Sequence, residues 1–322
     1  MTTRVHVWGA SGYAAAEAIR LLALHPALEI GVLESRSHAG FAVADHFPDL
    51  RTLPFRFSQA GAVAEALSAG DVVIAAGSHG EARAHVPGFL AKGARVVDLS
   101  ADYRFDDDAV YGLTEFYRAA IAQASLVANP GCYPTATLLA LLPLLQEGRP
   151  RQLIVDAKSG ITGAGRNPAV GSLYAEVARD IRAYGLEGHR HQPEIERVLG
   201  AHDALAPLVF TPHVLPLARG MLVDAYAIYD AVPDEVAVRG VFARAYAGSS
   251  FVRVLDGQTP SVAAVVGTNE AELRIDVVGT TVRVICAIDN LGKGAAGQAV
   301  ANINVMLGLP EETGFGARAI VA

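Results

Sequence analysis

Residues 5–15 read Val-His-Val-Trp-Gly-Ala-Ser-Gly-Tyr-Ala-Ala, a short apolar run followed by a turn with two glycines. Over residues 13–24 apolar side chains recur at helical spacing, and Pro26 ends the predicted helix. Four more short apolar runs, separated by helical segments, cover residues 28–33, 72–76, 96–99 and 126–128. Apolar strands that alternate with helices are typical of a parallel sheet buried on both faces. The first part of the chain is therefore predicted to be an α/β domain of the Rossmann type.

The pattern changes after about residue 131. An apolar helix is predicted over residues 135–145, and longer strand-like segments follow at residues 208–212, 221–229, 272–278 and 281–288. The last two segments are predicted to pair antiparallel. Residues 292–307 are predicted to form a closing helix, with Gly308 and Pro310 as stop signals. The second part is therefore expected to be α+β, with a mixed or antiparallel sheet.

Composition and charge restrict the class of protein. The chain has 322 residues, enough for two domains, and its 52% hydrophobic and 18% charged residues are typical of a compact enzyme. The net charge of −7 and the lack of basic clusters argue against nucleic acid or an anionic membrane as a partner. Two cysteines cannot form a disulfide framework and fit a reducing compartment. The longest apolar stretch is too short to span a membrane and no signal peptide is found, so a cytoplasmic protein is expected.

The turn after the first strand has the features of a dinucleotide-binding site. Its two glycines allow a tight turn and close approach of a pyrophosphate, and the following helix directs its N-terminal N–H groups at the anion. Ala15 takes the helix–sheet packing position, where a small residue suffices. The turn residues predicted to bind the cofactor are Gly9, Ser11, Gly12, Tyr13 and Ala14. An ordinary strand–helix turn is the alternative, and the surrounding alternation of strands and helices favours a nucleotide.

The second strand ends in Glu34-Ser35-Arg36-Ser37, which bears on the choice of cofactor. An acidic residue at this place often binds a ribose 2′-hydroxyl, whereas Arg and Ser favour a 2′-phosphate. A solvated loop charge is the alternative role for Arg36. We expect Ser35 and Arg36 to bind NADP, while Glu34 keeps NAD as the alternative cofactor.

Cys132 lies between a predicted strand and a predicted helix, in the segment Asn-Pro-Gly-Cys-Tyr-Pro-Thr of residues 129–135. Gly131 allows a turn, and Pro134 is tolerated in the first turn of a helix. At a helix N-terminus the dipole and the free N–H groups stabilise a thiolate and lower its pKa, and they can also hold an oxyanion. Cys286, inside an apolar strand, fits the alternative role of a small buried hydrophobe. Cys132 is therefore the candidate nucleophile.

Two histidines, an arginine and two carboxylates lie within residues 188–196, Gly-His-Arg-His-Gln-Pro-Glu-Ile-Glu. An imidazole can pass a proton to and from a substrate oxygen or a thiol near neutral pH. Glu194 could hold such a ring in one tautomer. A zinc site is the competing interpretation, but His-x-His followed by Pro is a weak zinc signal, and no metal is expected. A polar loop leading into a capped helix at Pro193 is the structural alternative.

Side chains that could bind a phosphate occur in three segments. Ser100 and Arg104 follow a strand, where the ligand sites of α/β sheets gather. Lys158 precedes a glycine-rich stretch, and Arg219 lies in a third segment, residues 213–220. For each cation, an ion pair at the surface or between domains is the alternative to substrate contact.

Taken together, these segments resemble the N-acetyl-gamma-glutamyl-phosphate reductases of arginine biosynthesis. The matching segments occur in order over nearly the whole chain, at residues 9–17, 35–40, 98–104, 111–113, 129–135, 156–166, 189–196, 210–220, 251–254 and 287–302. The resemblance implies NADPH-dependent reduction of N-acetyl-gamma-glutamyl phosphate to N-acetyl-glutamate semialdehyde and phosphate. It implies a thioester on Cys132, with His191 as acid and base. It also implies a homodimer or homotetramer that acts on a small-molecule acyl phosphate.

The resemblance implies further site residues and the domain limits. Ser78, Gly160 and Asn290 would contribute to the cofactor site, and Asn129 would join the candidate substrate-binding residues. The closing helix would pack on the first domain. The implied division is a dinucleotide-binding domain of residues 1–131 plus 291–322 and a catalytic and oligomerisation domain of residues 132–290. The chain departs from the usual family pattern at Ala15, Glu34 and Ser78, and Glu34 bears most on the preference for NADP.

Two other interpretations stay open. The same chemistry could act on an aminoadipyl phosphate linked to a carrier protein in lysine biosynthesis, which would require a docking surface for the carrier. A more remote alternative is a non-catalytic NADP-binding sensor, in which Cys132 would not react rapidly with iodoacetamide. An aspartate-semialdehyde dehydrogenase is disfavoured, because residues 189–194 do not resemble its pattern.

Overall fold

Two compact units make up the chain, residues 1–130 with 295–322 and residues 131–294. The computed structural model describes residues 2–146, 148–202 and 206–316. The last six residues of the predicted first domain, 317–322, therefore lie outside the described residues. Each unit is described by itself below.

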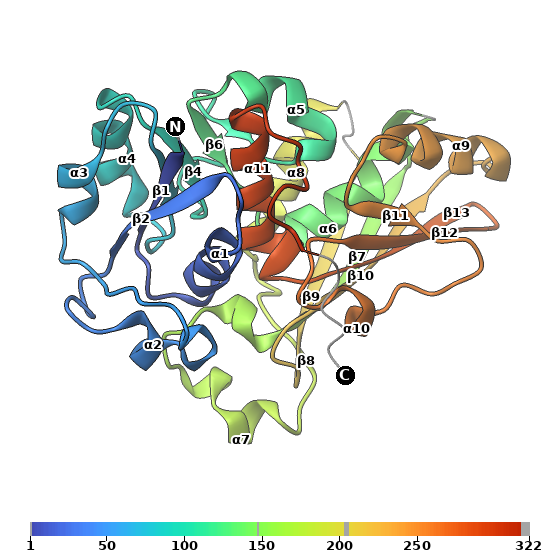
Figure 1. The fold of residues 1–322 in the computed structure, drawn as a ribbon. Coiled ribbons are helices and arrows are strands. Elements are labelled where there is room, and N and C mark those ends of the chain that lie inside the picture. Colours follow the sequence, from blue (N-terminus) through green and yellow to red (C-terminus); the bar gives the residue numbers. More distant parts are fainter. Residues whose placement is uncertain (1, 147, 203–205, 317–322) are drawn as a thin grey trace. The chain divides into compact units, whose positions relative to one another are not determined.

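The first unit contains a six-stranded sheet with the order β2-β1-β3-β4-β6-β5, in which every pairing is parallel (Figure 1). Its strands are β1 (Thr3–Trp8), β2 (Leu28–Glu34), β3 (Val72–Ala75), β4 (Arg95–Asp98), β5 (Val110–Tyr111) and β6 (Leu126–Ala128). Its helices are α1 (Tyr13–Ala23), α2 (Val43–His46), η1 (Pro48–Leu50), α3 (Ala62–Ala66), α4 (Ala82–Ala91), α5 (Thr114–Gln123) and α11 (Gly297–Met306). The expected Rossmann-type parallel sheet is confirmed.

Alternate residues of the central strands of this sheet are buried on opposite faces. On β3, Val72 and Ile74 pack in the hydrophobic cluster that includes α1 and α11. Val73 and Ala75 pack in the cluster that includes α3 and α4. All four side chains are 0% exposed. Because helices cover both faces, the strand is apolar at every position, which is why the sequence shows a continuous apolar run.

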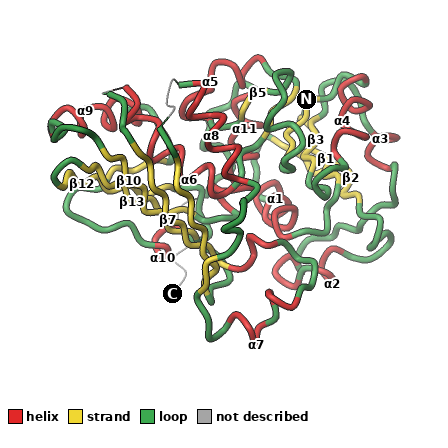
Figure 2. The backbone as a smooth tube through the Cα atoms, turned by 180° about the vertical axis from the view of Figure 1, so that it is seen from behind, coloured by secondary structure: helices red, strands yellow, loops and turns green. Residues whose placement is uncertain are grey.

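The second unit contains a seven-stranded mixed sheet with the order β11-β12-β13-β10-β7-β9-β8, whose middle strands lie side by side in Figure 2. Its strands are β7 (Gln152–Gly160), β8 (Arg182–Ala183), β9 (Leu208–Leu215), β10 (Met221–Ile228), β11 (Val252–Val254), β12 (Ala271–Val278) and β13 (Thr281–Ile288). Strand β9 runs parallel to β7, and β11 runs parallel to β12, whereas the other pairings are antiparallel. The expected α+β unit with a mixed sheet is confirmed.

Helix α6 (Cys132–Leu141) is buried from its second residue to its last and packs on β10, β13 and α8. The other helices of this unit are η2 (Leu142–Gln146), η3 (Ile161–Ala164), η4 (Val170–Ser172), α7 (Tyr174–Val177), α8 (His191–Ala201), α9 (Glu235–Tyr246) and α10 (Val262–Val265). The buried helix begins earlier and ends earlier than the predicted span of 135–145. Pro143 has no N–H to donate, so the chain tightens into the 3-10 turn η2.

The closing segment is not one regular helix as predicted over residues 292–307. A π-helical turn, η5 (Gly292–Ala296), precedes α11. Gly308 adopts φ +71°, which ends the helix in the left-handed conformation, as its predicted role as a stop signal requires. Among the described residues, no helix has both the length and the apolar character to cross a bilayer.

Candidate active site

The turn between β1 and α1 has a backbone shape that only glycine allows. Gly9 adopts φ +80°, and a Cβ at this position would lie 2.5 Å from the backbone nitrogen of Gly77. Gly12 directly precedes α1, and no described side chain caps that helix end. Ala15, which is 1% exposed, packs α1 on the sheet. The first N–H groups of α1 have no acceptor inside the helix, so this helix end suits an anion held by residues 9–14, where Ser11, Tyr13 and Ala14 also lie.

At the end of β2 a cation is exposed to solvent and a carboxylate is buried. Glu34 is 4% exposed, and its Oε2 accepts the backbone N–H of Val63 at the start of α3 at 2.9 Å. Arg36 is exposed and pairs with Glu81 at 2.6 Å. The carboxylate of Glu34, which kept NAD as an alternative cofactor, therefore binds the start of α3 instead. Ser35 is buried beside it, and Ser78 is exposed in the loop after β3.

Cys132 is the first residue of α6, as the sequence predicts, and is partly exposed. The N–H of Gly131, just before it, donates to Oε1 of Glu194 at 2.9 Å. Thr135 Oγ1 donates back to the carbonyl of Gly131 at 3.0 Å. The first N–H groups of α6 have no acceptor inside the helix, so they can stabilise a thiolate or an oxyanion. Cys286, in contrast, is 0% exposed on β13.

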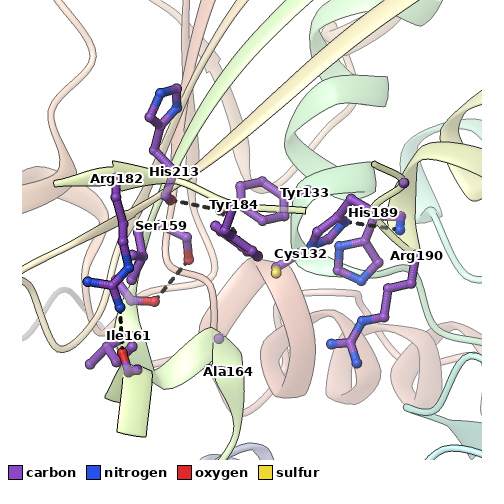
Figure 3. A pocket seen from close by; sticks show the side chains of 16 residues that line it. Cys132, Tyr133, Ser159, Ile161, Ala164, Arg182, Tyr184, His189, Arg190 and His213 are labelled. Carbon is purple, nitrogen blue, oxygen red and sulfur yellow. Dashed lines mark hydrogen bonds between the residues drawn. The ribbon is translucent and has the colours of Figure 1, made fainter. Parts of the chain in front are cut away.

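A cavity of about 470 Å³ lies beside Cys132 and is lined by residues of the second unit (Figure 3). Besides Cys132, its polar lining residues are Tyr133, Ser159, Arg182, Tyr184, His189, Arg190, His191 and His213. Its glycines include Gly160, where a Cβ would lie 2.9 Å from the carbonyl oxygen of Ala218. The cavity therefore brings a thiol, imidazoles and guanidinium groups together in a space suited to a small anionic substrate.

The two histidines of residues 188–196 both line this cavity but differ in their environment. His191 is 4% exposed at the start of α8, two residues before the predicted start at Pro193, and its backbone N–H donates to Nδ1 of His189 at 3.1 Å. Burial, assisted by the nearby charge of Arg190, lowers the pKa of His189 to about 4. His189 is therefore a neutral ring at neutral pH, with its proton on Nε2. Such a ring is a poor proton donor, which favours His191 for acid–base chemistry.

Two tyrosines connect the start of α6 to the strands of the sheet. Tyr184 Oη donates to Tyr133 Oη at 3.2 Å, and Tyr133 Oη donates to the carbonyl of His213 at 3.0 Å (Figure 3). Burial raises the pKa of both phenols, so both hydroxyl groups keep their protons. The pair therefore supplies hydrogen-bond donors, and the residue next to the candidate nucleophile is anchored to β9.

Gly294 lies directly against the candidate nucleophile. A Cβ at position 294 would lie 2.8 Å from the Cβ of Cys132, a separation that real Cβ atoms do not adopt. The N–H of Gly294 donates to the carbonyl of Asp289 at 2.9 Å, within the turn that starts η5. The absence of a side chain at this position therefore sets where the Cys132 backbone can lie.

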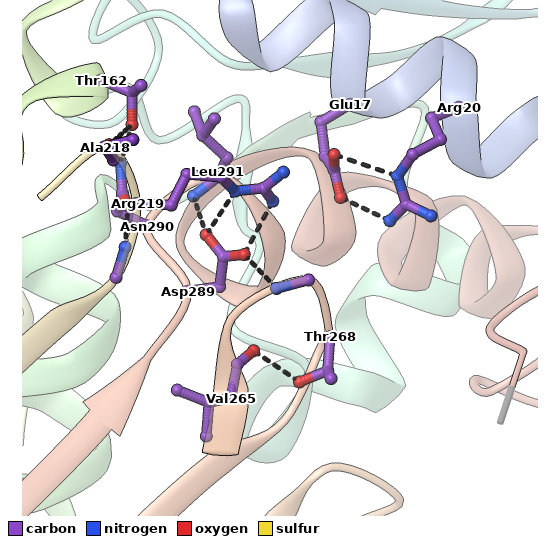
Figure 4. A network of polar contacts seen from close by, with 12 residues as sticks. Glu17, Arg20, Thr162, Ala218, Arg219, Val265, Thr268, Asp289, Asn290 and Leu291 are labelled. Atoms are coloured by element: carbon purple, nitrogen blue, oxygen red, sulfur yellow. Dashed lines mark hydrogen bonds and ion pairs between the residues drawn. The ribbon is translucent and has the colours of Figure 1, made fainter. Parts of the chain in front are cut away.

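A buried carboxylate orders the segment that carries Gly294 (Figure 4). Asp289 is 0% exposed and accepts hydrogen bonds from Arg219 Nη2 at 2.7 Å and from the N–H groups of Gly267 and Leu291 at 2.6 and 2.9 Å. Asn290 accepts the N–H of Gly220 at 2.7 Å and donates to Thr162 Oγ1 at 3.0 Å. These bonds join three loops of the second unit and leave little freedom to residues 289–294.

The predicted substrate-binding cations of the second unit are both ion-paired. Lys158 Nζ lies 2.6 Å from Asp224 and 3.1 Å from Asp156. Arg219 is held by Asp289, and neither cation lines the cavity. Direct contact with a substrate would require these pairs to open.

The predicted anion-binding residues of the first unit form a local cluster. Arg104 is 6% exposed and donates to the carbonyl oxygens of Asn129 and Leu99 at 2.9 and 3.0 Å. Ser100 Oγ donates to Asp98 at 2.8 Å. The side-chain amide of Asn129 accepts a hydrogen bond from Asn302 at 3.1 Å. These contacts tie the loop after β4 to the end of β6.

Two cations in the cavity were missed from the sequence. Arg182 is held by Asp180 at 2.8 Å and by the carbonyl of Gly171 at 2.8 Å. The guanidinium of Arg190 makes no hydrogen bond or ion pair with any described residue. A signal for Arg190 existed, because it stands between two histidines. Arg182 had none, since its strand has only two residues.

Comparison with known proteins identifies families and relatives that match both units. Residues 4–124 match the family model described as semialdehyde dehydrogenase, NAD binding domain, and residues 132–290 match semialdehyde dehydrogenase, dimerisation domain. N-acetyl-gamma-glutamyl-phosphate reductase 1 of Pseudomonas putida is 43% identical over 97% of both chains. The N-acetyl-gamma-glutamyl-phosphate reductase of Neisseria meningitidis is 43% identical over 98% of this chain and 97% of its own.

Solved structures share the fold at lower sequence identity. A probable aspartate-semialdehyde dehydrogenase from Pseudomonas aeruginosa superposes with a TM-score of 0.76 at 20% identity, over 95% of this chain and 99% of its own. Aspartate semialdehyde dehydrogenase with NADP from Candida albicans gives 0.72 at 16% identity, over 94% and 98%. These structures show the shared fold, and the family models identify the first unit as a nicotinamide-dinucleotide-binding domain and the second as a unit of the dimerisation-domain type.

Proposed function

This chain belongs to the N-acetyl-gamma-glutamyl-phosphate reductase family, and we propose that it reduces N-acetyl-gamma-glutamyl phosphate to N-acetyl-glutamate semialdehyde and phosphate, with NADPH, in arginine biosynthesis. The observation that carries the proposal is the cavity that Cys132, His191 and Arg190 line together. A thiol at a helix start, an imidazole and a cation are the groups that acyl transfer from a phosphate to sulfur requires. The matching relatives are named for this activity and share nearly the whole length of the chain.

NADPH rather than NADH is the proposed hydride donor. The turn at Gly9 and the start of α1, which no described side chain caps, fit a pyrophosphate. The turn requires glycine at position 9, because a Cβ there would clash with the backbone of Gly77. Glu34 is engaged with Val63, while Arg36 and Ser35 remain at the end of β2, which favours a 2′-phosphate. When bound, NADPH supplies the hydride that takes the thioester to the aldehyde level.

Cys132 opens the reaction as the nucleophile. Its thiolate attacks the acyl carbon, the C–S bond forms, and the bond from carbon to the phosphate oxygen breaks. The N–H groups at the start of α6 stabilise the developing oxyanion. Arg190 binds the departing phosphate, since its guanidinium is uncommitted, in place of Arg104, which is bound to two carbonyl groups. Arg182, fixed by Asp180, binds the carboxylate of the substrate.

His191 handles the proton. It donates a proton to the carbonyl oxygen as the carbon is reduced, and takes it back as the C–S bond breaks, so that aldehyde leaves and thiolate is regenerated. Glu194 acts through the backbone: its hydrogen bond to Gly131 holds the turn that carries the nucleophile. Gly294 packs against Cys132, and the carbonyl of Asp289 holds Gly294 through its N–H.

We further propose that the protein is cytoplasmic and forms a homodimer or homotetramer. The match of residues 132–290 to a dimerisation-domain model supports self-association through the second unit.

Phosphate-dependent cofactor reduction tests the proposal in the reverse direction. Purified protein mixed with N-acetyl-glutamate semialdehyde, phosphate and NADP should form NADPH, and leaving out phosphate should abolish the reaction. Faster turnover of a carrier-linked aminoadipate semialdehyde would contradict the proposed substrate. Cofactor binding without oxidation of either aldehyde would contradict the enzyme assignment itself.

A further inference from the structure

The edge strand β8 and the residue after it direct two side chains toward the cavity beside Cys132. The N–H of Tyr184 donates to the carbonyl of Pro212 at 3.0 Å, so the pairing of β8 with β9 continues through residue 184. Alternate residues of an extended strand point to the same side. Arg182 and Tyr184 both line the cavity, and Figure 3 shows Tyr184 between Arg182 and the sulfur of Cys132. These two side chains can therefore contact neighbouring groups of one ligand.

The hydroxyl of Tyr184 offers an acceptor to the cavity. The carbonyl of His213 can only accept, so the proton of Tyr133 Oη lies in that bond of 3.0 Å. The proton of Tyr184 Oη is then the one that lies between the two phenols, which are 3.2 Å apart. With its proton used in this way, Tyr184 Oη keeps its lone pairs, and it accepts no hydrogen bond from any residue that the structure describes. Tyr184 is 38% exposed, so a ligand in the cavity can reach this oxygen.

The charges around the cavity select against a free amine. Arg182 and Arg190 are cations, and no carboxylate is found among the described residues that line the cavity. Asp180, which pairs with Arg182, is not one of the lining residues. An α-ammonium group would therefore leave water to lie beside two guanidinium groups without a counter-ion. An acylated amine carries no charge and still offers an N–H, so the cavity favours a substrate whose amine is blocked.

We propose that Tyr184 determines the specificity for an N-acylated substrate, because its Oη accepts the amide N–H of that substrate. The amide nitrogen and the carboxylate of such a substrate are attached to the same carbon atom, which matches the alternate positions of Tyr184 and Arg182 along one extended segment. Tyr133 acts as a positioning residue, because its bond to the carbonyl of His213 sets the direction of the hydrogen-bond chain. The inference rests on the proposed function, since it names the group by which the same site recognises its substrate.

A substrate analogue without the N–H isolates this contact. In 2-acetoxy-5-oxopentanoate an ester oxygen replaces the amide N–H of N-acetyl-glutamate semialdehyde, and the two aldehydes are otherwise alike. In phosphate-dependent reduction of NADP, the unaltered protein should use the ester with a kcat/KM about 10- to 100-fold lower, because two oxygen atoms with lone pairs would face each other. Tyr184→Phe should lower kcat/KM for the amide about tenfold and leave kcat/KM for the ester unchanged or higher.

Tyr133→Phe should change the same preference from the other end of the hydrogen-bond chain. It removes the acceptor of the Tyr184 proton, so this hydroxyl can turn and donate to the ester oxygen, and the preference for the amide should fall about threefold or more. Tyr174→Phe is the matched control, because Tyr174 belongs to the same unit, is 87% exposed and does not line the cavity. It should leave kcat/KM for both aldehydes unchanged. Melting temperatures show whether each variant is folded.

Three outcomes would overturn the role of Tyr184 and leave the proposed function intact. Equal losses for both aldehydes in Tyr184→Phe would mean that the hydroxyl only holds Tyr133 in place. Unchanged kinetics with both aldehydes would mean that the hydroxyl does not contact the substrate. Equal use of amide and ester by the unaltered protein would show that the N–H is not recognised. Failure of the proposed function looks different, because the unaltered protein would then oxidise neither aldehyde in the presence of phosphate and NADP.

Discussion

Cys132 and Cys286 lie in the same unit, yet their surroundings are opposite in kind. Cys132 begins a helix, is partly exposed and lines a cavity with imidazoles and guanidinium groups. Cys286 lies within β13, pairs with β10 and β12, and is 0% exposed. The difference shows that the reactivity expected of a thiol comes from its place on the backbone and from nearby polar groups.

The largest expected effect is on activity. Cys132→Ser should lower kcat by a factor of about 1,000 or more. A serine hydroxyl is not ionised near neutral pH, and the site has no base strong enough to deprotonate it. Phosphate-dependent reduction of NADP measures the loss, and calorimetry should show unchanged NADP binding. Cys286→Ser is the matched control and should keep its turnover. Comparable activity in Cys132→Ser would remove the distinction between the two cysteines.

The second effect concerns the contact that places the nucleophile. Gly294→Ala should lower kcat about 10- to 100-fold with little change in KM, because the new methyl group displaces Cys132 from its position. Iodoacetamide should also alkylate Cys132 more slowly. Gly200→Ala in α8 is the control, since nothing lies within 4 Å of a Cβ there. A lower melting temperature with normal alkylation would mean that Gly294 matters for stability only.

The third effect concerns the buried cysteine. Cys286→Ser should reduce the free energy of unfolding by about 1–3 kcal/mol, because it places a hydroxyl at a fully buried position of an apolar strand. Denaturant unfolding measures the change, and Cys286→Ala separates the loss of sulfur from the gain of a polar group. If the serine variant unfolds like the original protein, the surroundings of Cys286 are less apolar than the structure indicates.

The smallest expected effect is on the pH dependence of stability. It concerns His189, which lines the cavity beside Cys132. The pKa of His189 is lowered to about 4 from 6.5, so the unfolded chain takes up its proton first as the pH falls. The stability contributed by the neutral ring is thus complete above pH 6.5 and is lost as the pH falls toward 4. His189→Gln should flatten this part of the stability curve, by on the order of 1 kcal/mol after allowance for solvent exposure. Melting temperatures at a series of pH values test it, and parallel curves for both proteins would count against the low pKa.

The fold was predictable where short-range patterns carry it. Apolar runs predicted β3 and the other buried strands, and Gly131 with Pro134 predicted the helix that Cys132 begins. The helix limits were less accurate. Pro143 turned the last residues of the predicted helix into η2, and the π-helical turn at residues 292–296 leaves no periodic signal distinct from an α-helix.

The candidate site was predictable only in part, because several side chains depend on distant partners. Glu34 is 29 residues from Val63, whose N–H it binds, so the sequence could not show that this carboxylate is withdrawn from the end of β2. Arg219 and Asp289 are 70 residues apart, and their pairing was equally hidden. The roles assigned to Cys132, His191 and the other site residues stay predictions until the variants are measured.

From the sequence by itself come the alternation of strands and helices, the glycine turn after β1 and the placement of a thiol at a helix start, because each depends on residues a few positions apart. Only the tertiary structure showed which cations line the cavity and which form ion pairs with carboxylates. It also showed that Gly294 lies against Cys132. The physical reason is that contacts between side chains depend on distances in space. The short segments that bring Arg182 and Arg190 to the cavity and Gly294 to Cys132 have no periodic pattern that would reveal their course.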